Sequence, residues 1–242
     1  NVGRSFEAPT LVELAYRPVI TDPGLNLDLK ASKSTQYEIG VKSYLTDSTR
    51  VEAAAFYIDT ENEIVVANNT GGRVSYQNAG DTSRKGVEFT LDTRINKSLS
   101  GFATVTLLDA KFDDAFLTCT TTLCPNVNPQ VPVAAGNKLA SVANKTFFGE
   151  LTYRHTASGF LGGIEYRASG RMYANDTNDA RVGGYGIASI RGGFTQTVGG
   201  WKLNEFARID NLFDKEYVGS VYINEGSQRY YAPASERTWL PR

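Results

Sequence analysis

The sequence predicts an all-β protein, an antiparallel up-and-down transmembrane β-barrel, and three observations support this prediction. Apolar and polar residues alternate with a period of two in several stretches of about ten residues. The connections between these stretches are alternately short and long along the chain. Glycine (23 residues), tyrosine (13) and phenylalanine (12) are abundant, and turns and strands favour these residue types.

The bulk composition limits the classes of function. The chain has 242 residues with 25 basic and 26 acidic side chains, so no excess of positive charge favours nucleic acid binding. No apolar run reaches the roughly 18 residues that a membrane helix needs, but membrane strands stay possible. The length allows one large β domain or two small ones. Because the chain starts without Met or an apolar signal segment, we expect a mature or excised piece.

Eight complete strands follow from the alternation. They are expected at about 37–44, 50–58, 85–95, 99–112, 145–155, 160–169, 185–196 and 201–212. In the third strand, one face carries Val87, Phe89, Leu91, Thr93 and Ile95, and the other carries Glu88, Thr90, Asp92 and Arg94. The tail of a further strand lies before Phe6, and another begins at Thr238–Trp239. Soluble antiparallel sandwiches alternate in the same way, so this pattern alone does not choose between the two folds.

The lengths of the connections favour the barrel. Short turns are expected at 45–49, 96–98, 156–159 and 198–200, and long segments at 59–84, 113–144, 171–184 and from 213 onward. In an up-and-down barrel every second connection lies at the same end, and outer-membrane barrels have short periplasmic turns and long external loops. A sandwich gives no reason for this sorting. The apolar faces would then meet lipid, and the charged faces would line a wet lumen.

The stretch Asn211–Asp214 is predicted to mark the exit of a strand from the membrane. Asn211 and Asp214 are expected to cap the turn, because Asn and Asp bond readily to nearby backbone. Leu212 and Phe213 are expected at the apolar interface. Any strand that ends in a turn would show the same chemistry, so this stretch alone does not identify a barrel.

The two cysteines, Cys119 and Cys124, enclose four residues in a Thr-, Pro- and Asn-rich segment. We expect them to form a disulfide in an oxidising compartment, the alternative being two unpaired thiols. No further Cys or His lies near enough in sequence to suggest a metal site. His155, the sole histidine, is expected at the surface of the periplasmic end.

No enzyme, cofactor or metal site is predicted from the sequence, which contains no catalytic Ser–His–Asp arrangement and no phosphate-binding glycine loop. Asp176, Asn178 and Asp179 could supply oxygen ligands to calcium. Their spacing does not match a known calcium loop, so a solvated acidic loop is the favoured interpretation.

Three motifs in order resemble those of TonB-dependent outer-membrane receptors: GRSFEAPTLVEL (3–14), SYQNAGDTSRKGVEF (75–89) and RIDNLFDKEY (208–217). Residues 64–80, the close cysteine pair and residues 211–233 look most like the pyrroloquinoline quinone receptor subfamily. The resemblance implies part of a 22-stranded barrel, with about eight full strands in this chain. It places residues 1–242 in the C-terminal part of the barrel domain, with the plug domain absent and the last strand incomplete.

The resemblance also implies TonB-dependent uptake of a scarce small-molecule ligand, with pyrroloquinoline quinone as the first choice. The alternatives are a ferric siderophore or other ferric chelate as ligand and, in a different class, a passive pore. The implied partners are TonB, acting through a plug, and outer-membrane lipid, with phage or bacteriocin as further candidates. The implied location is the bacterial outer membrane, with the long loops outside the cell.

Pyrroloquinoline quinone is a planar aromatic tricarboxylate, so its site should offer arginines for the carboxylates and aromatic faces for stacking. The candidate ligand-binding residues are Arg229, Tyr230, Tyr231, Arg73, Tyr76, Arg171, Tyr173, Arg181 and Arg4. The first three form the strongest cluster, because a basic side chain adjoins two aromatic ones. For each residue the alternative is structural: a lumen arginine paired with a carboxylate, or a tyrosine in the interfacial belt.

Overall fold

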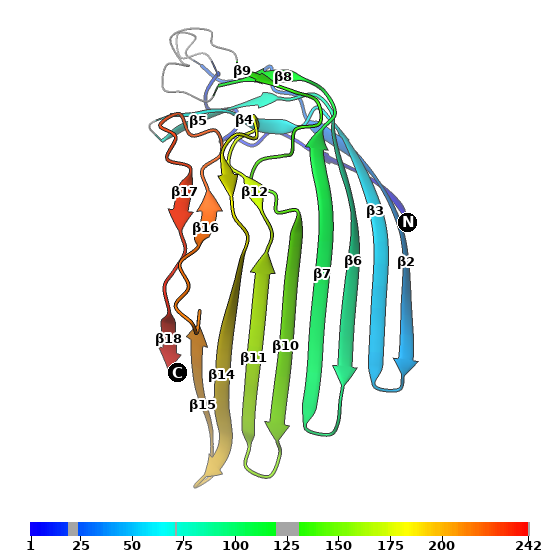
Figure 1. Cartoon of the computed structure of the whole chain (residues 1–242), viewed down its shortest axis with the longest axis vertical. Helices are drawn as coiled ribbons and strands as arrows, with labels where there is room; N and C mark the ends of the chain where they lie inside the picture. The colour runs from blue at the N-terminus through cyan, green and yellow to red at the C-terminus, as the bar shows by residue number, and fades with distance from the viewer. Residues whose placement is uncertain (19–23, 71, 120–130, 242) are drawn as a thin grey trace.

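The computed structural model describes residues 1–18, 24–70, 72–119 and 131–241. One antiparallel sheet of ten strands forms a curved wall (Figure 1). In spatial order its strands are β1 (Val2–Glu7), β2 (Ser32–Thr46), β3 (Thr49–Glu61), β6 (Thr82–Arg94), β7 (Leu99–Phe112), β10 (Lys145–His155), β11 (Phe160–Ser169), β14 (Tyr185–Val198), β15 (Trp201–Asp210) and β18 (Thr238–Pro241). Each strand pairs with the strands nearest to it along the chain, which is up-and-down topology.

All eight predicted strands are confirmed, and the two partial strands are β1 and β18 at the edges of the sheet. The structure extends β2, β3 and β6 beyond their apolar stretches. There the inner side chains are polar and bond to one another, as Ser34 does to Thr60 across β2 and β3 (Oγ–Oγ1, 2.9 Å). Alternation of apolar residues could not reveal these extensions, because both faces become polar. Within the described residues β1 does not pair with β18, so the barrel is not closed in this chain.

The short turns lie at one end of the sheet and the long connections at the other (Figure 1). The long connections after β3, β7, β11 and β15 are more ordered than their irregular sequences indicate, since each of these four contains a small hairpin. These are β4 (Ile64–Thr70) with β5 (Arg73–Asn78), β8 (Phe116–Thr118) with β9 (Val131–Val133), β12 (Met172–Tyr173) with β13 (Arg181–Val182), and β16 (Val218–Val221) with β17 (Tyr231–Pro233). Strands of two to seven residues are too short to show a clear period in sequence.

The two faces of the sheet differ as predicted. One face exposes large apolar side chains, among them Ile39, Val87, Phe89, Leu151, Ile164 and Phe194. The opposite face carries ion pairs. In the described part of the chain no second sheet covers the apolar face, which excludes the sandwich and suits contact with lipid. None of the described residues forms a helix that is long and apolar enough to cross a membrane.

The buried apolar cluster lies beneath the loops rather than behind the sheet. Its members are Ala79, Ala110, Phe112, Val133 and Leu139, from the ends of β5 and β7 and from the segment around β9. The Phe112 ring meets the Phe116 ring edge-on at a centroid distance of 4.8 Å. This cluster fixes the loop end of the sheet.

The exit turn after β15 confirms Asn211 as a cap, whereas the Asp214 side chain bonds outside the turn. Asn211 is buried with φ of 50°, and its side chain accepts from the Lys215 amide and donates to the Lys215 carbonyl, both at 2.9 Å. Asp214 Oδ1 accepts from the backbone amide of Arg237 at 2.8 Å. Asn211 and Asp214 have φ of 50° and 53°, in the left-handed region that Asn and Asp adopt more readily than other side-chain-bearing residues.

Candidate ligand-binding surface

Four loop hairpins meet at one buried side chain, Asn224, in the turn between β16 and β17. Asn224 is 0% exposed. Its Nδ2 donates to the Val66 carbonyl of β4 (2.7 Å) and to Asp176 Oδ2 between β12 and β13 (2.7 Å), and it lies 3.4 Å from Thr118 Oγ1 of β8. Its Oδ1 accepts from the Asp176 amide at 3.1 Å. We call these four hairpins, joined at Asn224, the loop platform.

Further backbone contacts tie the hairpins together. The amide of Asn224 donates to the Ala174 carbonyl at 3.2 Å, and the amide of Gly226 donates to the Asn69 carbonyl at 2.8 Å. Asn137 Nδ2 donates to the Asp176 carbonyl at 2.9 Å. Because buried amides and carboxylates are costly unless their bonds are made, the hairpins are held in one arrangement.

Asp176 departs from the expected solvated acidic loop around residues 176–179, whereas Asp179 is exposed as expected. It is 2% exposed, and burial raises its pKa to about 6, although the hydrogen bond from Asn224 acts in the opposite direction. Asn178 instead bonds to Lys138, accepting from its amide at 2.7 Å. Within the described ranges no group of three or more His, Cys, Asp or Glu side chains could hold a metal ion.

We expect the loop platform to lose stability as pH rises from about 4 to about 6. The pKa of Asp176 in the folded platform lies above its ordinary value of 3.8, so the folded state binds the proton more tightly than the unfolded one. The protonated Asp176 carboxyl stabilises the platform fully below pH 4. This stabilisation falls by up to about 3 kcal/mol by the time the carboxyl is ionised. Thermal melting of the full-length protein at low and neutral pH checks this. Asp176→Asn should remove most of the pH difference, and an equal difference in the variant would contradict the assignment to Asp176.

The strongest predicted cluster divides into a buried and an exposed part. Tyr230 is 8% exposed and packs into the platform, where burial raises its pKa. Tyr231 is 48% exposed, and its ring lies edge-on to that of Tyr230 at 6.2 Å. Arg229 is exposed as well. Tyr230 is therefore structural, and Arg229 and Tyr231 present the free surface.

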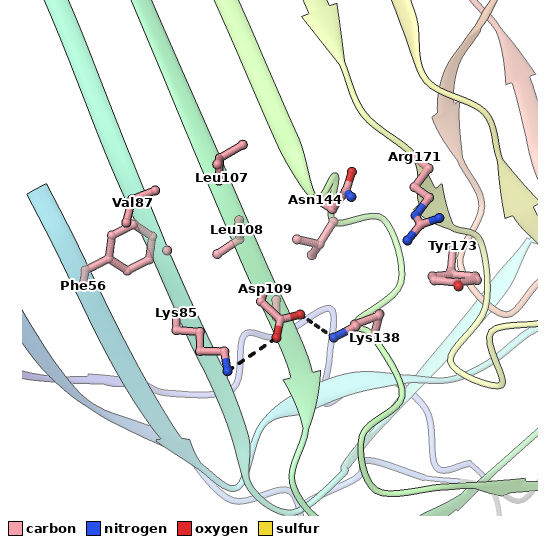
Figure 2. A pocket seen from close by; sticks show the side chains of 13 residues that line it. Phe56, Lys85, Val87, Leu107, Leu108, Asp109, Lys138, Asn144, Arg171 and Tyr173 are labelled. Atoms are coloured by element: carbon pink, nitrogen blue, oxygen red, sulfur yellow. Dashed lines mark hydrogen bonds and ion pairs between the residues drawn. The ribbon is translucent and has the colours of Figure 1, made fainter. Parts of the chain in front are cut away.

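Two other candidates join Tyr231. Its hydroxyl lies 3.5 Å from the Arg181 carbonyl, and Arg181 pairs with Tyr173 between β13 and β12. Tyr173, Arg181 and Tyr231 thus lie together, although they are far apart in sequence. Arg171 and Tyr173 also border a hollow that contains Lys85 and Lys138 (Figure 2).

The remaining candidates lie elsewhere. Arg73 sits over the Tyr16 ring at 4.2 Å, and the Tyr76 carbonyl accepts from Asn26. Arg4 pairs with Thr35, two positions from Tyr37, so it shares the apolar face of the sheet and not the lumen side.

The cysteine prediction falls partly outside the described residues. Cys119 follows β8, and its Sγ lies 3.4 Å from Asn68 Nδ2. Cys124 lies outside the described ranges, and the Cys119–Cys124 disulfide stays a prediction. His155 is exposed beside the 156–159 turn, where Nδ1 lies 2.8 Å from Ser158 Oγ, at the end where sequence placed it.

Below the platform, the inner face carries an ion-pair network that sequence did not single out. Glu165, 7% exposed, accepts two bonds from Arg208 at 2.6 and 2.8 Å and lies 3.2 Å from Arg191 Nε. Arg191 also pairs with Glu150. Because Glu150 and Glu165 face each other across β10 and β11, the arginines offset their repulsion.

Asn224 was not singled out from the sequence, and Asp176 was assigned to a solvated loop. Asn224 lies inside the stretch that carries the subfamily resemblance, shortly before the charged and aromatic residues Arg229, Tyr230 and Tyr231. One signal was available: Asn tolerates positive φ, and Asn178 and Asn224 have φ of 63° and 52°. Nothing in sequence shows that residues 66, 176 and 224 meet, since this depends on the pairing of the whole sheet.

Comparison with known proteins places these features in context. Residues 1–212 match the family model described as TonB dependent receptor-like, beta-barrel. The ferrichrome outer membrane transporter/phage receptor of Escherichia coli (strain K12) is 32% identical over 199 residues, which cover 81% of this chain and 24% of that protein. The ferrioxamine receptor of Yersinia enterocolitica is 30% identical over 236 residues, covering 90% of this chain and 29% of that protein.

Among solved structures, the ferric yersiniabactin uptake receptor FyuA from Yersinia pestis superposes with a TM-score of 0.68 at 22% identity. The match covers 98% of this chain and 33% of that one, and it shows the fold. The chain thus spans between 24% and 29% of the length of the two curated relatives.

Proposed function

Because this chain belongs to the family of TonB dependent receptor-like β-barrels, we propose that it forms the C-terminal part of the barrel of an outer-membrane receptor that takes up a ferric siderophore. The observation that carries the proposal is the identity of 32% and 30% to relatives named for ferrichrome and ferrioxamine. The ferric chelate, given above as the alternative ligand, therefore takes precedence over pyrroloquinoline quinone. The family consists of receptors, in line with the expectation that the chain is not an enzyme.

The exposed part of the loop platform supports a binding role. Arg181, Arg229 and Tyr231 are exposed, while Tyr230 and Asn224 anchor the same segment from below. Guanidinium groups bind carboxylate and other oxygen-rich anions, and a tyrosine offers an apolar face together with a hydroxyl. Side chains fixed by a buried base lose little conformational entropy on binding, which favours affinity.

The test is calorimetric titration of the full-length receptor in detergent with ferrichrome, ferrioxamine and pyrroloquinoline quinone. We expect saturable binding of a ferric chelate that pyrroloquinoline quinone does not displace. Tyr231→Ala should weaken this binding about tenfold, the effect of losing roughly 1.4 kcal/mol at a contact residue. Tyr44→Ala is the matched control, because Tyr44 is exposed beside a turn at the opposite end.

Two outcomes would contradict the proposed ligand or the proposed function. Binding of pyrroloquinoline quinone alone would restore the subfamily interpretation that the resemblance suggested. Absence of saturable binding, combined with unassisted permeation of small solutes through reconstituted protein, would favour a passive pore. If a chelate binds and Tyr231→Ala binds as tightly as wild type, the proposed surface is wrong although the function stands.

The partners follow from the same family membership. TonB is proposed to act through a plug supplied by other parts of the full-length receptor. A phage is a further candidate partner, since one relative is described as a phage receptor, and the external loops are the surface that it would meet.

A further inference from the structure

The exposed candidate residues of the loop platform come from two of its hairpins. Arg181 belongs to the hairpin of β12 and β13, whereas Arg229 and Tyr231 belong to the hairpin of β16 and β17. The Tyr231 hydroxyl lies 3.5 Å from the Arg181 carbonyl, so the two hairpins meet near their exposed side chains. A ligand that contacts all three side chains needs both hairpins in one fixed arrangement.

The same two hairpins are joined at their buried end by Asp176 and Asn224. Asn224 Nδ2 donates to Asp176 Oδ2 at 2.7 Å, and the Asp176 amide donates to Asn224 Oδ1 at 3.1 Å. The Asn224 amide adds a bond to the Ala174 carbonyl at 3.2 Å. Asp176 is 2% exposed and Asn224 is 0% exposed. We call Asp176 and Asn224 the hairpin joint, because the position of one hairpin relative to the other depends on their bonds.

The Asp176 carboxyl has neutral partners in the described part of the chain. They are the side-chain amide of Asn224 and the backbone amide of Ala140. The charged groups of the surrounding elements bond elsewhere: Lys138 to Asp109, Asp179 to Asn175, and Glu225 to the Ser227 amide. A buried carboxylate without a cation is costly, because surroundings of low dielectric constant disfavour the charged form. The protonated carboxyl therefore suits the closed joint, and ionisation favours separation of the hairpins.

We propose that protonation of Asp176 keeps the two hairpins together and thereby controls how long the exposed surface holds its ligand. The inference rests on the proposed function, since it concerns the release of a ferric chelate from that surface. With the carboxyl protonated, the hairpins stay in place and the ligand leaves slowly. With the carboxyl ionised, the hairpins separate more often and the ligand leaves faster. The surface thus holds its ligand longer in acidic surroundings than at neutral pH.

The sign and size of the effect follow from the environment of the carboxyl. Burial raises its pKa from 3.8 to about 6 in the closed joint, and the ordinary pKa returns when the hairpins separate and water reaches the group. The proton therefore stabilises the closed joint fully below pH 3.8, and this stabilisation is lost as the pH rises through 6. Between pH 5 and pH 7.5 the open population should grow about tenfold. Release that requires separated hairpins should accelerate by the same factor.

Hydrogen exchange of the full-length receptor in detergent tests the joint without any ligand. Asp176→Asn keeps a neutral side chain at every pH, so it is the reference for the wild type at the same pH. The ratio of wild-type to variant exchange rates, at backbone amides near residues 174, 176 and 224, should rise about tenfold from pH 5 to pH 7.5. Glu216→Gln is the matched control, because it removes an exposed carboxyl near the same hairpin. It should exchange like the wild type at both pH values.

Dissociation of ferrichrome from the loaded full-length receptor tests the consequence for release. It should be about tenfold faster at pH 7.5 than at pH 5 in the wild type and in Glu216→Gln, and nearly equal at the two pH values in Asp176→Asn. Equal release at both pH values in the wild type, or an exchange ratio that does not change with pH, would overturn the proposal. If neither ferrichrome nor ferrioxamine binds, the proposed ligand class fails, and the exchange ratio alone decides for or against the proton-controlled joint.

Discussion

Replacing Asn224 by alanine should lower the stability of the loop platform by about 4 kcal/mol, because several buried groups lose their partner at once. The Val66 carbonyl, the Asp176 carboxyl and the Asp176 amide all bond to this side chain. Each buried group left without a partner costs about 1 to 3 kcal/mol, and no water reaches a site that is 0% exposed. The hairpins should then separate while the sheet persists.

Hydrogen exchange of the full-length receptor in detergent measures this effect. Backbone amides near residues 66, 176 and 224 should exchange much faster in Asn224→Ala, whereas amides in the middle of β6 and β7 should keep wild-type rates. Asn204→Ala is the matched control, since Asn204 is exposed on β15, where its side chain accepts a hydrogen bond from Thr195 at 3.0 Å. Unchanged protection in the loops would show that the hairpins stand independently.

Glu165→Ala should destabilise the ten-stranded sheet by about 1 to 3 kcal/mol, the usual cost of losing hydrogen bonds to a charged group. The loss is limited because Arg208 keeps its ion pair with Asp210, and Arg191 keeps its own with Glu150. Glu165 is the carboxylate that Arg208 and Arg191 share on the inner face. Removing it leaves these guanidinium groups repelling each other across β14 and β15. A fall in melting temperature of the full-length protein in detergent is the expected result.

Two further variants identify the cause. Glu205→Ala removes an exposed carboxylate of β15 and should leave the melting temperature near wild type. Glu165→Gln keeps the size of the side chain and removes only its charge, so it should lose nearly as much stability as Glu165→Ala. If Glu165→Gln is as stable as wild type, the loss in Glu165→Ala came from packing and not from charge.

Much of the fold could be predicted because alternation and connection length are local properties of the chain. The alternate residues from Val87 to Ile95 show the lipid face directly. The turn at 96–98 shows which end of the sheet has the short connections. The four hairpins could not be predicted from period, since β12 and β13 have two residues each. Their conformation depends on contacts between loops that only the assembled sheet brings together.

The candidate site was predicted less completely for the same reason. Residue type correctly indicated Arg181 and Tyr231 as surface groups, but it could not separate Tyr231 from its buried neighbour Tyr230. The acidic run at 176–179 looked solvated because its sequence is polar. Burial of Asp176 results from the approach of Asn224, and these residues are separated by 48 positions in the chain.

The division of the platform into a buried base and exposed tips bears on how such a protein changes over generations. Substitutions at tip residues such as Arg229 alter what the surface recognises without touching the bonds around Asn224. Under the proposed function, natural variants can therefore bind a new ligand by small steps, each of which leaves a foldable protein. Substitutions around Asn224 would instead disrupt all four hairpins at once. We therefore expect sequence diversity to accumulate at the exposed tips.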